Sequence, residues 1–135
     1  MNSNATSVDN RTLPLMEVIK HTLKYISNQA LQKLQEQVGK VVPAKIRWVL
    51  TVPALWSEEH KLFMRKAAVS AGIIENVNSQ NLLLCLEPEG ASIQCREDAE
   101  KSVREQMVKD SIVMVLDCGG GTVDITVHKL LCEVD

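Results

Sequence analysis

The stretch VLDCGGGTVDITV, residues 115–127, places three consecutive glycines between two segments with the composition of β-strands. A plain hairpin turn is one explanation, because glycine accepts the positive φ that such turns require. Three glycines exceed that need. The backbone N–H groups of Gly119, Gly120 and Gly121 are uncovered and able to converge on a small anion, and Thr122 adds a hydroxyl donor. The spacing therefore favours a phosphate-binding loop.

Two aspartates flank this loop. Asp117 ends the first strand-like segment, and Asp124 follows seven residues later. A carboxylate beside a phosphate repels it unless a hard cation lies between them. The pattern therefore predicts Mg²⁺ near Asp117, held partly through water, with Asp124 within reach of the same cation.

A second candidate acid is Glu87, in the segment LEPEGAS at residues 86–92. It could cap a helix, stabilised by the positive end of the helix dipole. It could instead be a general base or a water-orienting group that faces a nucleotide. The spacing alone favours the helix-capping role, and Glu89 is expected to be an acid on the surface of the first helical turn.

Periodicity and punctuation residues predict the elements that carry these side chains. Residues 1–11 are polar and indicate a disordered or connecting segment. The expected elements are a helix from Leu15 to Gly39, a strand at 46–53, a helix from Ser57 to Gly72, a turn at 76–81, a short strand at 82–87, a helix after Pro88, a charged exposed segment at 97–110, and a hairpin of strands 111–117 and 123–130. This order is typical of α/β architecture with an antiparallel final pair.

The composition narrows the function classes. The chain has 135 residues, 45% of them hydrophobic, a net charge of −2 and only 3% aromatic residues. These values argue against nucleic acid and against a membrane as partners. The absence of a long apolar run or a signal-peptide pattern favours a cytoplasmic protein. The four cysteines show no paired spacing, so reduced and mostly buried thiols are expected.

Together, VLTVPALWSEEHKLFMRKAAVSAGI, LEPEGAS and VLDCGGGTVDITV resemble the nucleotide-binding domain of the heat-shock 70 kDa chaperone family, within the actin-type ATPase superfamily. The LW after TVPA and the EPE turn look most like the divergent heat shock 70 kDa protein 12 branch. The resemblance implies a partial actin-like ATPase core of the ribonuclease H-like type, α/β with a mixed sheet and flanking helices. Residues 1–12 would be a disordered or connecting segment and 13–135 a partial nucleotide-binding domain. Its first-lobe core would end near residue 110, and 111–130 would form the first hairpin of the second lobe.

The resemblance also implies roles for single residues. Asp117 resembles the family's acid that helps to hold hydrated Mg²⁺ and the attacking water, and Asp124 is similar to a further acid near the cation. Gly119 to Thr122 look like the second phosphate loop. Glu87 resembles an acid that lines the catalytic centre, which favours the catalytic role over the capping role. The implied ligands are ATP or ADP with Mg²⁺, and the implied partners are protein clients or co-chaperones.

The resemblance is partial. The family's first phosphate loop, catalytic lysine and adenosine-binding motif lie outside these residues, and Gly90 and Cys118 replace a usual alanine and a usual leucine. We therefore expect a segment of an ATP-binding, chaperone-like protein that supplies the second phosphate loop and the catalytic and metal-binding acids, and that is inactive alone. The alternatives are a non-catalytic interaction module that retains the ATPase fold, or a small-molecule kinase of the same superfamily.

Overall fold

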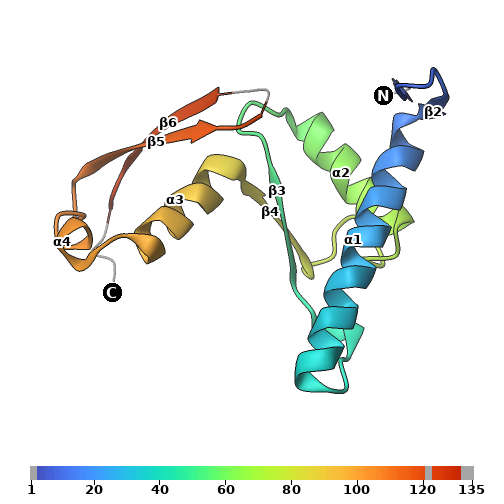
Figure 1. The fold of residues 1–135 in the computed structure, drawn as a ribbon, viewed down its shortest axis with the longest axis horizontal. Helices are drawn as coiled ribbons and strands as arrows, with labels where there is room; N and C mark the ends of the chain where they lie inside the picture. The colour runs from blue at the N-terminus through green and yellow to red at the C-terminus, as the bar shows by residue number, and fades with distance from the viewer. Residues whose placement is uncertain (1–2, 121–122, 132–135) are drawn as a thin grey trace. The chain divides into compact units, whose positions relative to one another are not determined.

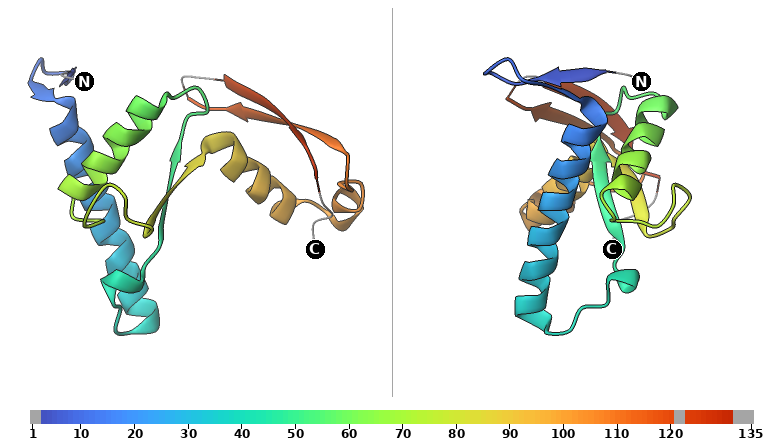
Figure 2. Two further views of the ribbon diagram at one scale, coloured as in Figure 1. Left: turned by 180° about the vertical axis from the view of Figure 1, so that it is seen from behind. Right: turned by 90° about the vertical axis from the view of Figure 1, so that its right-hand side faces the viewer.

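The computed structural model describes residues 3–120 and 123–131, and its chain divides into two compact units. Unit 1 contains residues 1–50 and 56–84, and unit 2 contains residues 51–55 and 85–135. Figures 1 and 2 show the elements, which in chain order are β1 (Asn4–Thr6), β2 (Thr12–Pro14), α1 (Leu15–Val38), the 3-10 turn η1 (Pro43–Lys45), β3 (Trp48–Val52), α2 (Glu58–Ser70), β4 (Leu82–Leu86), α3 (Glu87–Asp98), α4 (Lys101–Arg104), β5 (Ile112–Cys118) and β6 (Val123–Lys129).

The α/β class predicted from the sequence is confirmed. The expected single mixed sheet is not what the described residues form, because the strands pair as β1–β2, β3–β4 and β5–β6 in three separate two-stranded sheets. Within these residues, each strand is hydrogen-bonded to one other strand only. The lobe boundary expected near residue 110 stays a prediction.

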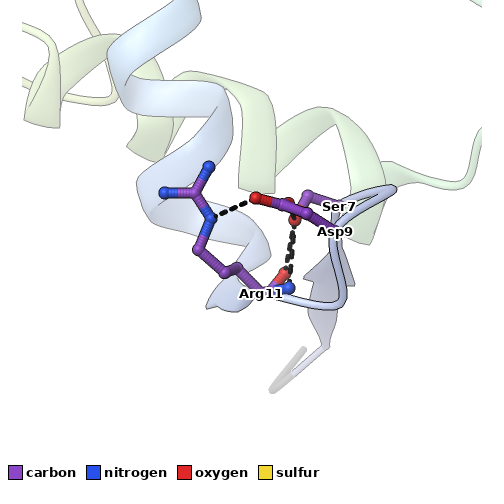
Figure 3. A network of polar contacts seen from close by, with 3 residues as sticks. All are labelled: Ser7, Asp9 and Arg11. Atoms are coloured by element: carbon purple, nitrogen blue, oxygen red, sulfur yellow. Dashed lines mark hydrogen bonds and ion pairs between the residues drawn. The ribbon is translucent and has the colours of Figure 1, made fainter.

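Unit 1 begins with a small antiparallel hairpin where the sequence favoured a disordered or connecting segment. Its turn is held by side chains rather than by an apolar pattern (Figure 3). The Ser7 hydroxyl donates to Asp9, the Arg11 Nε donates to Asp9 Oδ2 at 2.7 Å, and the Arg11 backbone N–H donates to Ser7 Oγ at 3.1 Å. Asn10 takes the left-handed conformation at φ 61°, which asparagine accepts more readily than most residues.

Helices α1 and α2 lie side by side in unit 1, and both begin and end close to the predicted positions (Figure 2). Glu58 and Glu59 place negative charge in the first turn of α2, which the helix dipole favours. At the other end, Gly72 has φ 78° and donates its N–H to Val69 O at 3.0 Å, while Ile73 N–H donates to Ala68 O at 3.0 Å. These two bonds are those of a Schellman motif, which ends the helix.

The core of unit 1 forms where α2 meets the β3–β4 pair. Ala68, Ile74 and Leu82 are buried there, with Trp48 and Leu23 packed against them. The Trp48 N–H donates to Asn81 O at 2.7 Å, so the first residues of β3 lie beside the start of β4.

An arginine organises the loop that leads into β4. The guanidinium of Arg65 donates to three carbonyl oxygens, those of Val77, Ser79 at 2.6 Å and Leu82 at 2.9 Å. A planar fork with five donors is suited to such a set of acceptors. Arg65 therefore connects this loop and the first residue of β4 to α2.

Unit 2 consists of α3, α4 and the β5–β6 hairpin, together with the last residues of β3 and β4. Helix α3 packs against the hairpin (Figure 1). Its Gly90 lies close to Thr51, because a Cβ added at Gly90 would stand 3.5 Å from the Thr51 Cγ2. The charged segment at 97–110, which was expected to be exposed, contains the end of α3 and the short α4, and most of its residues are exposed.

Among the described residues, no helix has both the length and the apolar character needed to cross a bilayer. Cys95 and Cys118 are exposed and Cys85 is half-buried, so the expectation of mostly buried thiols is wrong for the cysteines that the structure describes.

Candidate functional site

The β5–β6 hairpin places the two predicted aspartates directly opposite each other. In the antiparallel register, Asp117 pairs with Asp124, and Cys118 pairs with Val123. Residues directly opposite on antiparallel strands have Cα atoms about 4.5–5.5 Å apart and side chains on the same face. Both aspartates are half-buried. Within the described residues, neither carboxylate makes a hydrogen bond or an ion pair, so their negative charges face each other without a compensating partner.

The hairpin burial pattern alternates, and the aspartates lie on its more buried side. Val115 is buried at 7% exposure and points to the same face as Asp117, whereas Leu116 and Cys118 point to the other face. We call the side of Val115, Asp117 and Asp124 the inward face, because the hairpin is packed against α3. The candidate metal-binding acids thus lie on the less exposed face of the hairpin, where both remain partly accessible to solvent.

The glycines at the end of β5 are exposed. Gly120 does not have a left-handed φ, and a Cβ built on it would meet no atom within 4 Å. Neither the backbone conformation nor packing among residues 3–120 and 123–131 therefore requires glycine at this position. Gly119 is likewise exposed. Gly121 and Thr122, the other two members of the predicted phosphate loop, lie outside the described residues.

The two acids at the start of α3, Glu87 and Glu89, differ in their hydrogen bonds and in their exposure. Glu89, two residues into the helix, accepts the Leu86 backbone N–H at 3.1 Å and the Cys85 thiol at 3.9 Å from Sγ. It is exposed, as the sequence predicted. Glu87 is the first residue of α3 and is half-buried, and within the described part of the chain its carboxylate has no hydrogen bond or ion pair. Glu89, and not Glu87, therefore accepts the hydrogen bonds at the start of this helix. The carboxylate of Glu87 could bind another group.

All predicted site residues that the structure describes belong to unit 2. Asp117 and Asp124 are brought together as a cross-strand pair, and Gly119 and Gly120 follow directly at the end of β5. Glu87 begins the helix that packs against this hairpin. The arrangement can therefore offer carboxylate oxygens to a hard cation and backbone N–H groups to an anion on neighbouring parts of one unit.

Sequence reasoning missed one polar pair on the inward face. Thr126 and His128 continue the row that Asp124 begins, and the Thr126 Oγ1 lies 2.9 Å from His128 Nε2. The strict alternation of VDITVHK places every second residue of β6 on this face, so the polar row was readable from the sequence. The pair gives unit 2 a further titratable group on the same face as the aspartates.

The sequence of this chain is similar to those of known proteins. The chain matches the family described as Hsp70 protein over residues 5–132. It is 34% identical to human heat shock 70 kDa protein 12B over 174 residues, which covers 92% of this chain and 25% of that protein. It is 30% identical to human heat shock 70 kDa protein 12A, covering 96% of this chain and 26% of that protein. It is also 30% identical to the chaperone protein DnaK of Methanothermobacter thermautotrophicus, covering 82% of this chain and 16% of DnaK.

No solved structure matches the chain. The chain spans about a quarter of the length of the heat shock 70 kDa protein 12 relatives that it matches. The family match covers nearly the whole chain and includes the hairpin, both aspartates and Glu87. The chain therefore belongs to the Hsp70 protein family.

Proposed function

We propose that unit 2 supplies one side of an ATP-hydrolysing site in a longer Hsp70-family protein with an actin-like nucleotide-binding domain. In this proposal, the β5–β6 hairpin binds nucleotide phosphates and a hydrated Mg²⁺, and Glu87 faces the reaction centre. The proposal follows the family membership and the arrangement of acids and glycines in unit 2.

The observation that carries the proposal is the pairing of Asp117 with Asp124. Like charges directly opposite on a hairpin destabilise it. Two half-buried carboxylates without a described counter-ion are therefore best explained by a bound cation. Oxygen ligands on facing strands suit a hard cation such as Mg²⁺, which usually keeps several of its waters. The two carboxylates are ligands of the type that suits the metal the family implies, and because no cluster of three or more metal-ligating side chains occurs among the described residues, water and phosphate would have to supply the other ligands.

The glycines support the phosphate part of the proposal. Gly120 is required neither by its φ nor by packing among the described residues, because a Cβ built on it would stand in open space. A phosphate that approaches the backbone closely would explain why residue 120 has no side chain. In this role, the N–H groups of Gly119, Gly120 and Gly121 and the hydroxyl of Thr122 would donate to phosphate oxygens.

Each acid then has a separate task. Asp117 and Asp124 would hold the cation through its water ligands, and Glu87 would orient the water that attacks the γ-phosphate. Bound Mg²⁺ would neutralise charge on the phosphates. The main contributions of the protein to phosphoryl transfer are positioning and electrostatic stabilisation. One side of a site cannot position the γ-phosphate, so this chain alone is expected to bind nucleotide weakly and not to turn it over.

The test is phosphate release by the chain extended at both ends with the flanking sequence of heat shock 70 kDa protein 12B. We expect Mg²⁺-dependent ATP hydrolysis by this protein, and a loss of about 100-fold or more in kcat for Asp117→Asn. Asp98→Asn, at the exposed end of α3, is the matched control and should keep the activity. Hydrolysis that is absent, or that is equal in the Asp117→Asn and Asp98→Asn proteins, would contradict the proposal.

A non-catalytic interaction module is the second candidate, and one observation favours it. The face of the hairpin opposite the aspartates is apolar and exposed. An extended protein that neither binds nor hydrolyses ATP, but that associates with a protein client or co-chaperone through unit 2, would support this candidate.

The cytoplasmic location expected from the sequence stays a prediction.

A further inference from the structure

Unit 2 has a second polar group beside the two aspartates of the hairpin. On the inward face of β6, Thr126 and His128 follow Asp124, and the Thr126 Oγ1 lies 2.9 Å from His128 Nε2. Both side chains are half-buried. We propose that the Thr126 hydroxyl accepts a hydrogen bond from a water ligand of the cation bound between the two aspartates, and that His128 orients this hydroxyl. The inference rests on the proposed ATP site and adds a positioning pair to it.

The location of this pair on the packed side of the hairpin is the first argument. The hairpin is packed against α3, and the residues of β5 opposite Thr126 and His128 are Val115 and Val113. A polar side chain on such a face loses hydration and costs free energy unless its hydrogen bonds are made. Valine or isoleucine would fill the same positions without that cost, so a hydroxyl and an imidazole here indicate a task beyond packing.

The register is the second argument, because it brings Thr126 close to both aspartates. Thr126 is two residues from Asp124 on the same strand and face, which corresponds to about 7 Å along a strand. It is directly opposite Val115, so it is the diagonal neighbour of Asp117, and diagonal residues lie about 7–8 Å apart. The three oxygen-bearing side chains therefore form a triangle on one face of the hairpin.

The size of this triangle suits a hydrated cation. Mg²⁺ binds its water ligands at about 2.1 Å and usually keeps several of them. A water ligand donates to an acceptor about 2.7–2.8 Å farther out, so such acceptors lie about 5 Å from the ion and up to about 10 Å from one another. Side chains about 5–8 Å apart on one sheet face fall within this range. They can surround the water shell without contacting the ion.

The hydrogen bond to His128 determines what Thr126 can offer to that shell. A hydroxyl has one donor and two acceptor sites. When the neutral imidazole carries its proton on Nδ1, the Thr126 hydroxyl donates to His128 Nε2, and its oxygen keeps its acceptor sites for a water ligand, which is a donor. Within the described residues, neither side chain makes another hydrogen bond. His128 would thus act as an outer group that orients an inner one.

An NMR titration of the 135-residue chain with ATP, with and without Mg²⁺, tests the inference through the Gly119 and Gly120 amide signals. We expect Thr126→Val to raise the Kd for Mg-ATP about fivefold and to leave the binding of ATP without Mg²⁺ unchanged, because valine keeps the shape and removes the acceptor. Thr126→Ser retains the hydroxyl and should bind Mg-ATP within about twofold of the unmodified chain. Thr51→Val removes an exposed hydroxyl elsewhere in unit 2 and is the matched control, with no change expected.

A double-mutant cycle tests the orienting role of His128. His128→Leu should raise the Kd for Mg-ATP about threefold, and the double variant with Thr126→Val should bind no more weakly than Thr126→Val alone. The imidazole Nε2 signal of His128 should shift on addition of Mg-ATP in the unmodified chain and stay in place in the Thr126→Val chain. Additive effects of the two substitutions would overturn the role of His128.

The outcomes distinguish this inference from the proposed ATP site. If Mg-ATP leaves the amide signals of the unmodified chain in place, both proposals fail. If the unmodified chain binds Mg-ATP and Thr126→Val binds it equally well, only the inference about Thr126 is overturned. It is also overturned if Thr126→Val weakens ATP binding equally without Mg²⁺. Circular dichroism establishes that each variant is folded, and valine is a residue that strands favour.

Discussion

At the scale of single residues, the two acids at the start of α3 differ in their surroundings although they are two positions apart. Glu89 is occupied by the Leu86 backbone N–H, and Glu87 has no described partner. The sequence could identify both as first-turn acids, but which of them makes the hydrogen bond depends on where the helix begins. The helix begins at Glu87, so Glu89 is in the third helical position, from which an acid reaches back to the residue before the helix.

Gly90 offers a test of how the same helix is packed. A methyl group at this position would meet Thr51 Cγ2 at 3.5 Å, an ordinary van der Waals contact, and Gly90 has no left-handed φ. We therefore expect Gly90→Ala to stabilise the chain by about 0.5–1 kcal/mol, measured by urea unfolding, because alanine loses less backbone entropy in a helix.

Gly72→Ala is the control, because it makes the same chemical change at a residue with φ 78°. It should destabilise the chain by about 1 kcal/mol. If Gly90→Ala lowers stability as Gly72→Ala does, the packing of α3 on Thr51 is not as described.

The hairpin turn at Asp9 has a defined pH dependence. The hydrogen bond from the Ser7 hydroxyl, aided by Arg11, holds the pKa of Asp9 below its usual value of 3.8. A lowered folded-state pKa stabilises the folded form above the usual pKa, and this contribution is lost as the pH falls through the folded value. We expect an NMR titration of the Asp9 carboxyl to have its midpoint below 3.8.

Ser7→Ala removes the largest cause of that shift and should return the midpoint toward 3.8. A midpoint at or above 3.8 in the unmodified chain would show that the turn network of Figure 3 is not formed in solution.

At the scale of elements, the side chain of Arg65 connects the loop before β4 to α2. Arg65 donates to the carbonyls of Val77, Ser79 and Leu82, and lysine, with a compact ammonium, cannot match this fork. Arg65→Lys should therefore destabilise the chain by about 1–2 kcal/mol in urea unfolding, because carbonyl groups lose their partners. Lys66→Met, at the exposed neighbouring position, should change stability by no more than about 0.5 kcal/mol. Equal effects of the two substitutions would remove the proposed role of Arg65.

Much of the element order could be predicted from the sequence because local signals determine it. Helix α2 has acids at its start and Gly72 after its end, and the glycine-rich bend implied an antiparallel β5–β6 pair. The β1–β2 hairpin was not predictable in the same way. Its turn is held by bonds among Ser7, Asp9 and Arg11, which have no periodic signature in the sequence. The pairing of Asp117 with Asp124 could not be predicted with the same precision, because it depends on the register between β5 and β6, which the sequence does not specify.

At the scale of the whole molecule, the length of the chain and the composition of its surface are the features to consider. The chain spans about a quarter of its heat shock 70 kDa protein 12 relatives and has an apolar hairpin face that its described residues do not cover. The described acids and glycines of the proposed site nevertheless all belong to unit 2. The phosphate side of the proposed site can therefore be examined on this chain alone, whereas turnover has to be measured on the extended protein.

The most direct measurement of the central claim is an NMR titration of the isotope-labelled 135-residue chain with ATP, in the presence and absence of Mg²⁺. The account predicts that the Gly119 and Gly120 amide signals move with Mg-ATP, with a Kd on the order of 1 mM, and that Asp117→Asn abolishes the movement. Amide signals that stay in place in this range, or that move equally in the Asp117→Asn chain, would contradict the claim that this hairpin binds the phosphates of a metal-bound nucleotide.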